Sequence, residues 1–290
     1  MSERPIHFHF RGEIRQLDGV APTRTVLQYL REDAHACGSK EGCAEGDCGA
    51  CTVVLGERVE GQLRLRAVNA CIQFVPSLDG KALFTVEDLD SLGGLGLTGL
   101  LHPVQQALVD RHASQCGFCT PGFAMSLFAL YENHVECPSR SVICDSLSGN
   151  LCRCTGYKPI VEAAIRASEA PATELKIDDS ADIPLLKEIK RATVPVYNLE
   201  GDIVVQPVVR TRKGSEFVSP ATLVELAEYL IEHPQATLLA GSTEIGLQVN
   251  KAFSRPEHIV YLGHVAELKK IEDKGPAWRI GAAVSLAEVE

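Results

Sequence analysis

A cysteine-rich segment near the N-terminus constrains this chain more than any other feature. Cys43, Cys48 and Cys51 are spaced C-x4-C-x2-C within KEGCAEGDCGAC, and Cys71 adds a fourth sulfur after nineteen intervening residues. The segment has almost no apolar side chain to bury, so a hydrophobic core cannot order it. Its spacing is that by which plant-type ferredoxins hold a 2Fe–2S cluster on four thiolates. Its glycines suit a loop whose N–H groups must turn inward at positive φ.

A second group of cysteines follows further along the chain. Cys116 and Cys119 form a C-x2-C pair, and Cys152 and Cys154 form a C-x-C pair. Four cysteines are also a common structural zinc set, so zinc remains an alternative, although the C-x-C half disfavours it. These spacings favour a second iron–sulfur cluster.

The number and grouping of the cysteines bear on the redox compartment. The chain has eleven cysteines, an odd number, and they are clumped rather than spread, which indicates metal ligation under reducing conditions rather than disulfides. Cys37, Cys137 and Cys144 match neither group. We expect these three to be ordinary buried or half-exposed thiols.

Composition excludes several classes of protein. A net charge of −10 argues against a nucleic-acid-binding surface, which needs clustered Lys and Arg. No apolar run approaches the roughly 18 residues of a membrane span, and the N-terminus lacks the apolar core of a secretory signal. We therefore expect a cytoplasmic globular chain, and its 290 residues allow two or three domains.

Residues 4–83 are predicted to form a β-grasp, ferredoxin-like domain. Alternating apolar residues over 6–18 indicate a β-hairpin, and Thr25 can cap a short helix. Residues 51–55 and 64–72 read as strands, the first rich in β-branched residues and the second carrying Cys71 near its end.

Residues 84–168 are predicted to form a four-helix domain that carries the second cysteine group. Its expected landmarks are Pro103 in a first helical turn, Thr120 as a cap ahead of Pro121, a shorter helix over 140–148, and Pro159 at the start of the last helix. A G-x-G-x-x-G run at 94–99 lacks the preceding strand of a dinucleotide fold, so we interpret it as an inter-domain connection.

The rest of the chain divides into a connector and a third unit. Residues 169–210 lack sustained periodicity and are predicted to be a linker, followed by a unit over 211–290. Within this unit, residues 237–245 combine a strand, a glycine turn and a Ser/Thr-led helix start, which is an anion-binding arrangement. The unit ends one turn into a helix, so we expect it to be the first part of a larger domain.

Several segments carry a family resemblance. KEGCAEGDCGACTV, VNAC, LHPVQQALVD, SQCGFCTPGF and GNLCRCTGYKPI together resemble the iron–sulfur half of the molybdenum hydroxylases. The resemblance covers residues 5–168 densely and resumes over 215–290, where LLAGSTEIGLQV resembles the family's first flavin-binding loop. The segments EGCAEGDCGACT and STEIG are most similar to the small subunits of the bacterial xanthine dehydrogenase branch.

The resemblance implies a fold and a set of cofactor sites. The fold would be α+β multidomain, with the β-grasp and helical domains followed by the first part of a vanillyl-alcohol-oxidase-like FAD-binding domain. One 2Fe–2S cluster, nearer the flavin, would be held by Cys43, Cys48, Cys51 and Cys71, and another, nearer a molybdenum cofactor, by Cys116, Cys119, Cys152 and Cys154. Gln115 would touch the pterin of that cofactor across a subunit boundary. The FAD pyrophosphate would be wrapped by Leu238, Leu239, Ala240, Gly241, Ser242, Thr243, Glu244 and Ile245.

The resemblance also implies an activity and partners. Electrons from the hydroxylation of hypoxanthine or xanthine to urate, at molybdopterin on a large partner subunit, would pass through both clusters to FAD and NAD+. The assembly would be a dimer of heterodimers, with no nucleic acid and no membrane. The family's second flavin loop, a Thr-Ile-Gly-Gly-Asn run, has no counterpart here, so the FAD site is incomplete in these residues. A subunit of an aldehyde or N-heterocycle hydroxylase and a stand-alone ferredoxin-like carrier or redox sensor remain the alternatives.

Overall fold

The structure of the chain is a computed structural model, which describes residues 5–59, 62–89, 101–134, 136–169, 196–197, 203–204, 210–212 and 215–289. The predicted connection at 94–99 lies outside the described residues, and so does most of the predicted linker at 169–210. Among the residues that are described, no helix has both the length and the apolar character to cross a membrane.

The N-terminal part is a five-stranded mixed sheet. Its strands are β1 (Ile6–Phe10), β2 (Glu13–Leu17), β3 (Thr52–Val59), β4 (Gln62–Asn69) and β5 (Ala82–Phe84), in the order β2-β1-β5-β3-β4. Strands β1 and β5 are parallel, and the other neighbours are antiparallel. The predicted hairpin and strands are therefore confirmed, with one correction. β4 ends at Asn69, so Cys71 lies in the turn after the strand rather than on it.

A short helix covers one face of this sheet. α1 (Val26–Gln28) continues as a π-helical turn over Tyr29–Asp33. Thr25 caps it as predicted, because its Oγ1 accepts the Gln28 N–H at 3.1 Å and the Gln28 side chain accepts the Thr25 N–H at 3.1 Å. Two short 3-10 helices, Val75–Leu78 and Val86–Asp88, flank β5.

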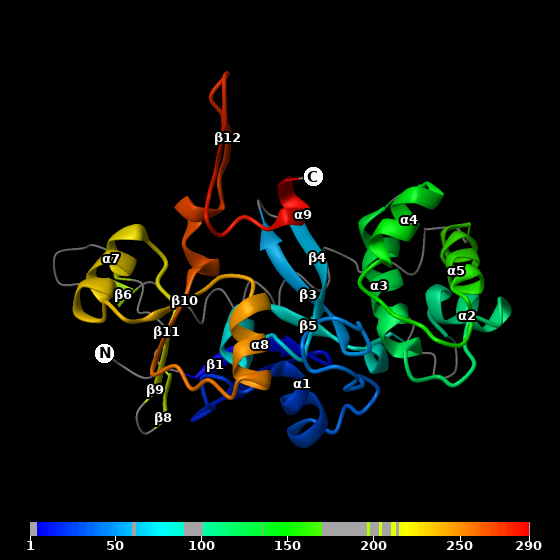
Figure 1. Cartoon of the computed structure of the whole chain (residues 1–290), viewed down its shortest axis with the longest axis horizontal. Coiled ribbons are helices and arrows are strands. Elements are labelled where there is room, and N and C mark those ends of the chain that lie inside the picture. The colour runs from blue at the N-terminus through cyan, green and yellow to red at the C-terminus, as the bar shows by residue number, and fades with distance from the viewer. Residues whose placement is uncertain are drawn as a thin grey trace.

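The opposite face of the sheet packs on a bundle of four helices, drawn in green in Figure 1. They are α2 (Pro103–Asp110), α3 (Thr120–Asn133), α4 (Arg140–Ser146) and α5 (Lys158–Ser168). α3 is central, since every residue from 122 to 131 is buried, and Val54 and Phe84 of the sheet belong to the same core. One prediction is wrong: the chain is already helical at Cys119, so Cys119 occupies the cap position and Thr120 is the first residue of α3.

The third part contains a four-stranded sheet in the order β10-β11-β9-β8. Its strands are β8 (Arg210–Arg212), β9 (Ser215–Val218), β10 (Thr237–Leu239) and β11 (His258–Tyr261), with helices α7 (Leu223–Glu232) and α8 (Thr243–Lys251). Smaller elements are β6 (Val196–Tyr197), β7 (Ile203–Val204), 3-10 helices Leu262–His264 and Ala266–Lys269, the β12 (Ile271–Asp273) and β13 (Trp278–Ile280) hairpin, and α9 (Leu286–Val289). The strand–turn–helix expected over 237–245 is present.

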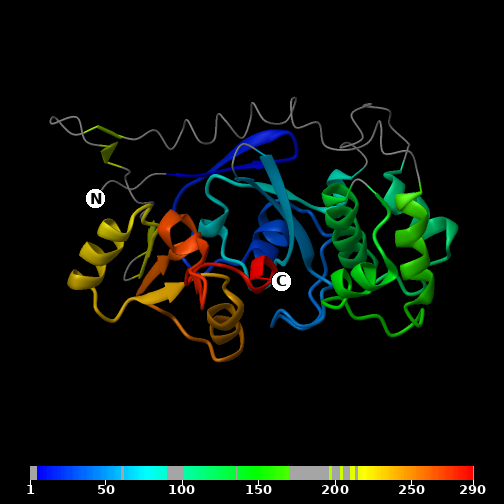
Figure 2. The same cartoon turned by 90° about the horizontal axis from the view of Figure 1, so that it is seen from above.

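The five-stranded sheet stands between the other two parts, as the two views in Figure 1 and Figure 2 show. Phe74, which follows β4, is fully buried in the core of the third part, among Phe217, Leu239 and Ile259. Both neighbours are thus anchored to the same central sheet. Its cysteine loop lies where they meet.

Candidate iron–sulfur and flavin sites

The first cysteine group is brought together at one end of the central sheet. The thiols of Cys43 and Cys48 are hydrogen-bonded to each other, and so are those of Cys51 and Cys71. The backbone N–H groups of Glu45, Asp47 and Cys48 point at Cys43 Sγ from 3.5, 3.3 and 3.4 Å. The loop therefore turns its N–H groups inward, as the glycine content predicted.

The electrostatics of this loop favour the thiolate at two of its four cysteines, Cys43 and Cys51, whereas burial raises the pKa of Cys48. Burial raises the pKa of Cys43, but the three backbone N–H donors outweigh it and hold that pKa below its ordinary value. The hydrogen bond between Cys51 and Cys71 lowers the pKa of Cys51 and, with burial, raises the pKa of Cys71. The thiolate is the form of cysteine that ligates metals, so the loop is prepared for ligation.

The second cysteine group also converges, at the foot of the helix bundle. Cys116 is hydrogen-bonded to Cys154, and Cys119 to Cys152. Burial raises the pKa of Cys152, but the hydroxyl and N–H of Thr155, at 3.1 and 3.4 Å from Sγ, bring it down to about 7. Burial and the hydrogen bond to Cys152 raise the pKa of Cys119 to about 12.

The donor sets fit a metal in both places. Each group offers four sulfurs, a donor set that 2Fe–2S clusters and tetrahedral zinc both use. The sulfurs contact one another in pairs, and no three of them lie within 4.8 Å of one another among the described residues, so the arrangement suits a two-iron cluster better than one zinc ion. Backbone N–H groups directed at the sulfurs are a means of tuning iron–sulfur clusters. Both groups have them, at Cys43 and at Cys152.

The two cysteine loops touch each other. The backbone N–H of Leu151 donates to the carbonyl oxygen of Cys48 at 2.9 Å, and Leu151 directly precedes Cys152. Gly49 permits this approach: it has φ +69°, and a Cβ there would lie 2.5 Å from Nδ2 of Asn150. One hydrogen bond thus joins the backbone of a first-group cysteine to the residue beside a second-group cysteine.

Asn150 ties the helix bundle to the first loop. Its Nδ2 donates to the Gly49 carbonyl at 3.0 Å and approaches Thr52 Oγ1 at 3.1 Å, while its Oδ1 accepts from Ser126 of α3 at 2.6 Å. The side chain is 4% exposed. Gly122 of α3 packs against the same carbonyl, with which a Cβ on Gly122 would clash. No pattern in the sequence predicted this role of Asn150.

The candidate flavin loop runs from β10 into α8. Ser242 adopts the left-handed conformation at φ +63°, and its Oγ donates to the carbonyl of Ile72 at 2.5 Å. The Gln73 side chain donates to the carbonyl of Gly241 at 2.9 Å. Thr243 and Glu244, the first residues of α8, are exposed, so the helix N-terminus is accessible to an anion.

The same helix reaches the first cysteine loop. Nδ2 of Asn250 donates to the carbonyl of Cys71 at 2.7 Å and to that of Ala44 at 3.0 Å. Lys251 lies 3.6 Å from Glu45. The helix α8 thus begins at the candidate flavin loop and contacts the first cysteine group through Asn250 near its C-terminal end. Asn250 is a second residue that sequence reasoning missed.

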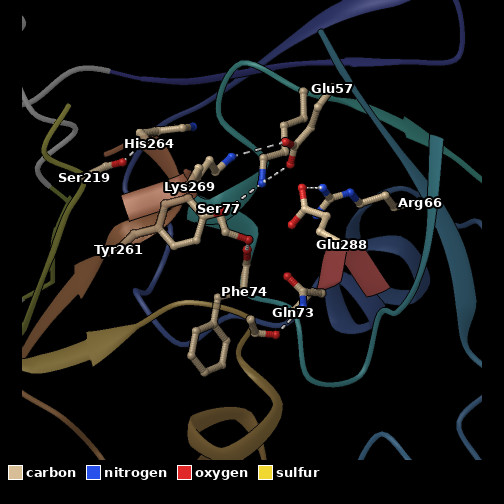
Figure 3. A network of polar contacts seen from close by, with 12 residues as sticks. Glu57, Arg66, Gln73, Phe74, Ser77, Ser219, Tyr261, His264, Lys269 and Glu288 are labelled. Atoms are coloured by element: carbon tan, nitrogen blue, oxygen red, sulfur yellow. Dashed lines mark hydrogen bonds and ion pairs between the residues drawn. The ribbon is translucent and has the colours of Figure 1, made fainter. Parts of the chain in front are cut away.

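A polar network fastens the third part to the sheet (Figure 3). The buried ammonium of Lys81 lies 2.9 Å from Glu57 and donates to the Tyr261 hydroxyl at 2.7 Å. Lys269 is 3.6 Å from the same carboxylate. Burial raises the pKa of Glu57, but Lys81 and Lys269 bring it down to about 2. Arg66 and Glu288 add a further ion pair.

The second cysteine group differs in being open on one side. Gln115 is exposed beside Cys116, which is itself exposed, as is Cys154. Phe118, Leu151 and Tyr157 lie close to these cysteines in sequence and have exposures of 48%, 53% and 40%.

The three unassigned cysteines correct a prediction. Cys37, Cys137 and Cys144 are all exposed, rather than buried or half-exposed. For Cys144 the reason is its position on α4, where the neighbouring Ile143 takes the buried face.

Comparison with known proteins covers all three parts of the chain. Residues 8–75 match the profile "2Fe-2S iron-sulfur cluster binding domain", residues 85–165 match "[2Fe-2S] binding domain", and residues 212–290 match "FAD binding domain in molybdopterin dehydrogenase". The chain belongs to the iron–sulfur and FAD-binding region of the molybdenum hydroxylase family.

The relatives of this region are much longer proteins. The chain is 37% identical over 298 residues to xanthine dehydrogenase of Drosophila subobscura, covering 93% of this chain and 22% of the relative. It is 33% identical over 316 residues to aldehyde oxidase 1 of Bos taurus, covering 98% and 23%. It thus spans less than a quarter of the length of these relatives. Quinoline 2-oxidoreductase from Pseudomonas putida 86 superposes on 66% of this chain and 98% of its own, at 29% identity and a TM-score of 0.47.

Proposed function

We propose that this chain is the electron-transfer subunit of a molybdenum hydroxylase of the xanthine dehydrogenase type. When bound, two 2Fe–2S clusters and FAD would carry electrons to NAD+ from hypoxanthine or xanthine oxidised at molybdopterin on a large partner subunit. The observation that carries the proposal is the contact between the cysteine loops. The N–H of Leu151 meets the carbonyl of Cys48, so the two candidate cluster sites are in direct backbone contact within one chain.

In this proposal each cysteine group holds one cluster, and the two clusters have different neighbours. Cys43, Cys48, Cys51 and Cys71 hold the cluster beside the flavin, and Cys116, Cys119, Cys152 and Cys154 hold the cluster beside the partner. Asn250 supports the first assignment, because it links α8, which begins at the candidate flavin loop, to the carbonyl of Cys71. Exposure of Cys116 and Cys154 supports the second.

The flavin would be held at the start of α8. Residues Leu238–Ile245 would surround its pyrophosphate, with the exposed N–H groups of the first helical turn as donors. The buried Ser242 fixes the turn by its hydrogen bond to Ile72, so the loop is set before any ligand arrives.

The partner would cover the face around Gln115. Phe118, Leu151 and Tyr157 give that face its apolar character. A cavity of about 470 Å³ beside the second loop, lined in part by Leu108 and Pro121, extends it. In this proposal Gln115 contacts the pterin across the subunit boundary, and two such heterodimers pair in the cytoplasm.

The main alternative is an aldehyde or N-heterocycle hydroxylase of the same family. Identity to an aldehyde oxidase is 33%, against 37% for a xanthine dehydrogenase, which is a small margin. We expect a complex purified with its large subunit to reduce NAD+ with xanthine and hypoxanthine faster than with aldehydes or quinoline-type heterocycles. Preference for an aldehyde or a heterocycle in that panel would replace the purine proposal by the alternative.

Metal content tests the cofactors separately from the substrate. We expect about four irons per chain and two distinct 2Fe–2S signals by electron paramagnetic resonance after reduction. About two irons would contradict the two-cluster proposal. Zinc without visible absorbance would favour a zinc-stabilised scaffold. A stable, monomeric holoprotein that bound no large subunit would favour the stand-alone carrier.

A further inference from the structure

A group of metal-ligand side chains lies outside the sites described above, in the third part of the chain. Glu216, His233 and His258 each offer a ligand atom, and the three atoms lie within 4.8 Å of one another. They are far apart in sequence and come from three segments. None of them belongs to the cysteine loops or to the candidate flavin loop.

Strand register and a helix end bring them together. Glu216 on β9 and His258 on β11 are paired residues of neighbouring parallel strands, so their side chains stand on the same face of the sheet. His233 follows the last residue of α7, and its N–H is bonded to the carbonyl of Tyr229 at 2.9 Å. All three side chains are half-buried, so an ion from solvent can reach them.

The spacing is close to that of a tetrahedral site. Two ligands at about 2.0–2.1 Å from a zinc ion at the tetrahedral angle are roughly 3.3 Å apart. His258 Nδ1 and Glu216 Oε2 are 3.4 Å apart already. The His233 and His258 rings lie with their centroids 4.2 Å apart, so a side-chain rotation can bring the third ligand into place.

The buried Tyr229 contacts two of the three candidate ligands. Its hydroxyl donates to Glu216 Oε2 at 3.1 Å and lies 3.0 Å from His258 Nδ1. The residue is 4% exposed, so these contacts are held in place by packing. Groups that hydrogen-bond to metal ligands orient them and raise affinity, and Tyr229 is placed to do this for the Glu216 carboxylate.

We propose that Glu216, His233 and His258 bind a divalent transition-metal ion of the zinc class. Two imidazoles and one carboxylate are a ligand set that zinc uses, whereas calcium and magnesium require mainly oxygen ligands. Solvent completes the coordination on the open side. The ion joins the end of α7 to β9 and β11, on the far side of the third part from the helix bundle (Figure 1).

Equilibrium dialysis of the holoprotein against micromolar Zn²⁺, followed by elemental analysis, tests the site. We expect one zinc per chain in addition to the iron. His233→Ala and His258→Ala each remove a ligand. Each should weaken zinc binding by more than the roughly 10–100-fold that is typical when a residue hydrogen-bonded to a ligand is changed. Tyr229→Phe should weaken it by about 10-fold. Glu216→Gln should also weaken zinc binding, because it removes a carboxylate ligand. Glu228 is an exposed acid on α7, so Glu228→Gln is the matched control and should leave zinc binding unchanged.

X-ray absorption at the zinc edge separates this site from stray binding to cysteine. Nitrogen and oxygen at about 2.0–2.1 Å, with imidazole scattering, would support the proposal. A sulfur shell at about 2.3 Å would overturn it. Zinc binding that persists in both histidine variants would also overturn it. If His258→Ala fails to fold, His233→Ala alone decides, because His233 lies beyond the helix and outside the strands.

Discussion

The two cysteine groups have the same donor atoms but different surroundings. Cys51 and Cys71 of the first group are 2% and 3% exposed, and their loop is covered by α8 on one side and by the helix bundle on another. In the second group, Cys116 and Cys154 are exposed. The first group therefore has two buried and two half-buried thiols, whereas the second leaves two of its four thiols at the surface.

The two cysteine groups therefore differ in what lies beside them. The enclosed group has its neighbours within this chain, namely the candidate flavin loop and the second cysteine group. The open group has one neighbour here and a bare face, with Gln115 at its edge. Two sets of polar contacts, which we call joints, hold the central sheet to its neighbours. Asn150 and Gly49 form the joint to the helix bundle, and Asn250 and Lys81 form the joint to the third part.

Gly49→Ala should lower the unfolding free energy most, because Gly49 lies in the contact that brings the two cysteine groups together. The substitution adds strain at φ +69° and a clash with Gly149 and Asn150. Together these should cost about 3–5 kcal/mol of unfolding free energy, measured by urea denaturation. Gly80→Ala is the control, since φ is +78° there and a Cβ would meet nothing within 4 Å. It should cost only about 1–2 kcal/mol. Equal losses would show that the close approach at Gly49 adds nothing.

Asn150→Ala and Asn250→Ala compare the two joints directly. Asn150 is buried, and its loss removes the acceptor of the buried Ser126 hydroxyl and two further hydrogen bonds to Gly49 and Thr52. We therefore expect a loss of about 3 kcal/mol of unfolding free energy, from unfolding midpoints at unchanged m-value. Asn250 is half-buried, and water can replace it at the carbonyls of Cys71 and Ala44, so about 1–2 kcal/mol is expected. A larger loss for Asn250→Ala would reverse the ranking of the joints.

The two joints should also differ in pH dependence, with a smaller effect. Burial, and then Lys81, lower the pKa of His264 to about 4, and its Nδ1 is 2.7 Å from Ser219 Oγ. Since the unfolded histidine binds its proton first, at about pH 6.5, stability is complete above that pH and falls as the pH drops toward 4. Between pH 6.5 and 5.5 the loss should be about 1 kcal/mol.

His264→Asn is the test variant for this effect. Its unfolding free energy should change less over the same pH range than that of the wild type. Asp79, Glu57 and Lys269 also face His264, but Glu57 has a pKa of about 2 and stays charged throughout. Parallel curves for the variant and the wild type would assign the pH dependence to another group.

Local patterns in the sequence were sufficient for much of the fold. The helix cap at Thr25, the hairpin over 6–18 and the proline at the start of α2 are short-range signals, and each is present. The cysteines within each loop could be grouped by their spacing, while Cys71 and the pair Cys152 and Cys154 join them from further along the chain. Where the pattern was weaker, errors were of one residue, as at Cys119 and Thr120, because a chain can enter a helix early without changing its apolar face.

Contacts between distant segments could not be predicted. Asn150 meets Gly49, Asn250 meets Cys71, and Glu216 meets His258 only because separate elements pack together. A single asparagine or glutamate on a polar face carries no signal of its partner. The exposure of Cys144 was missed for a related reason: which face of a short helix is buried depends on its neighbour rather than on its own composition.

Hydrogen exchange measured by mass spectrometry on the holoprotein, with and without its large subunit, tests the difference between the two groups most directly. We expect binding to protect residues 114–119 and 152–157 and to leave residues 41–48 unchanged. The Leu151 amide should already be protected in the free chain, because it donates to Cys48. New protection over 41–48, with none around Gln115, would contradict an enclosed first group and an open second one.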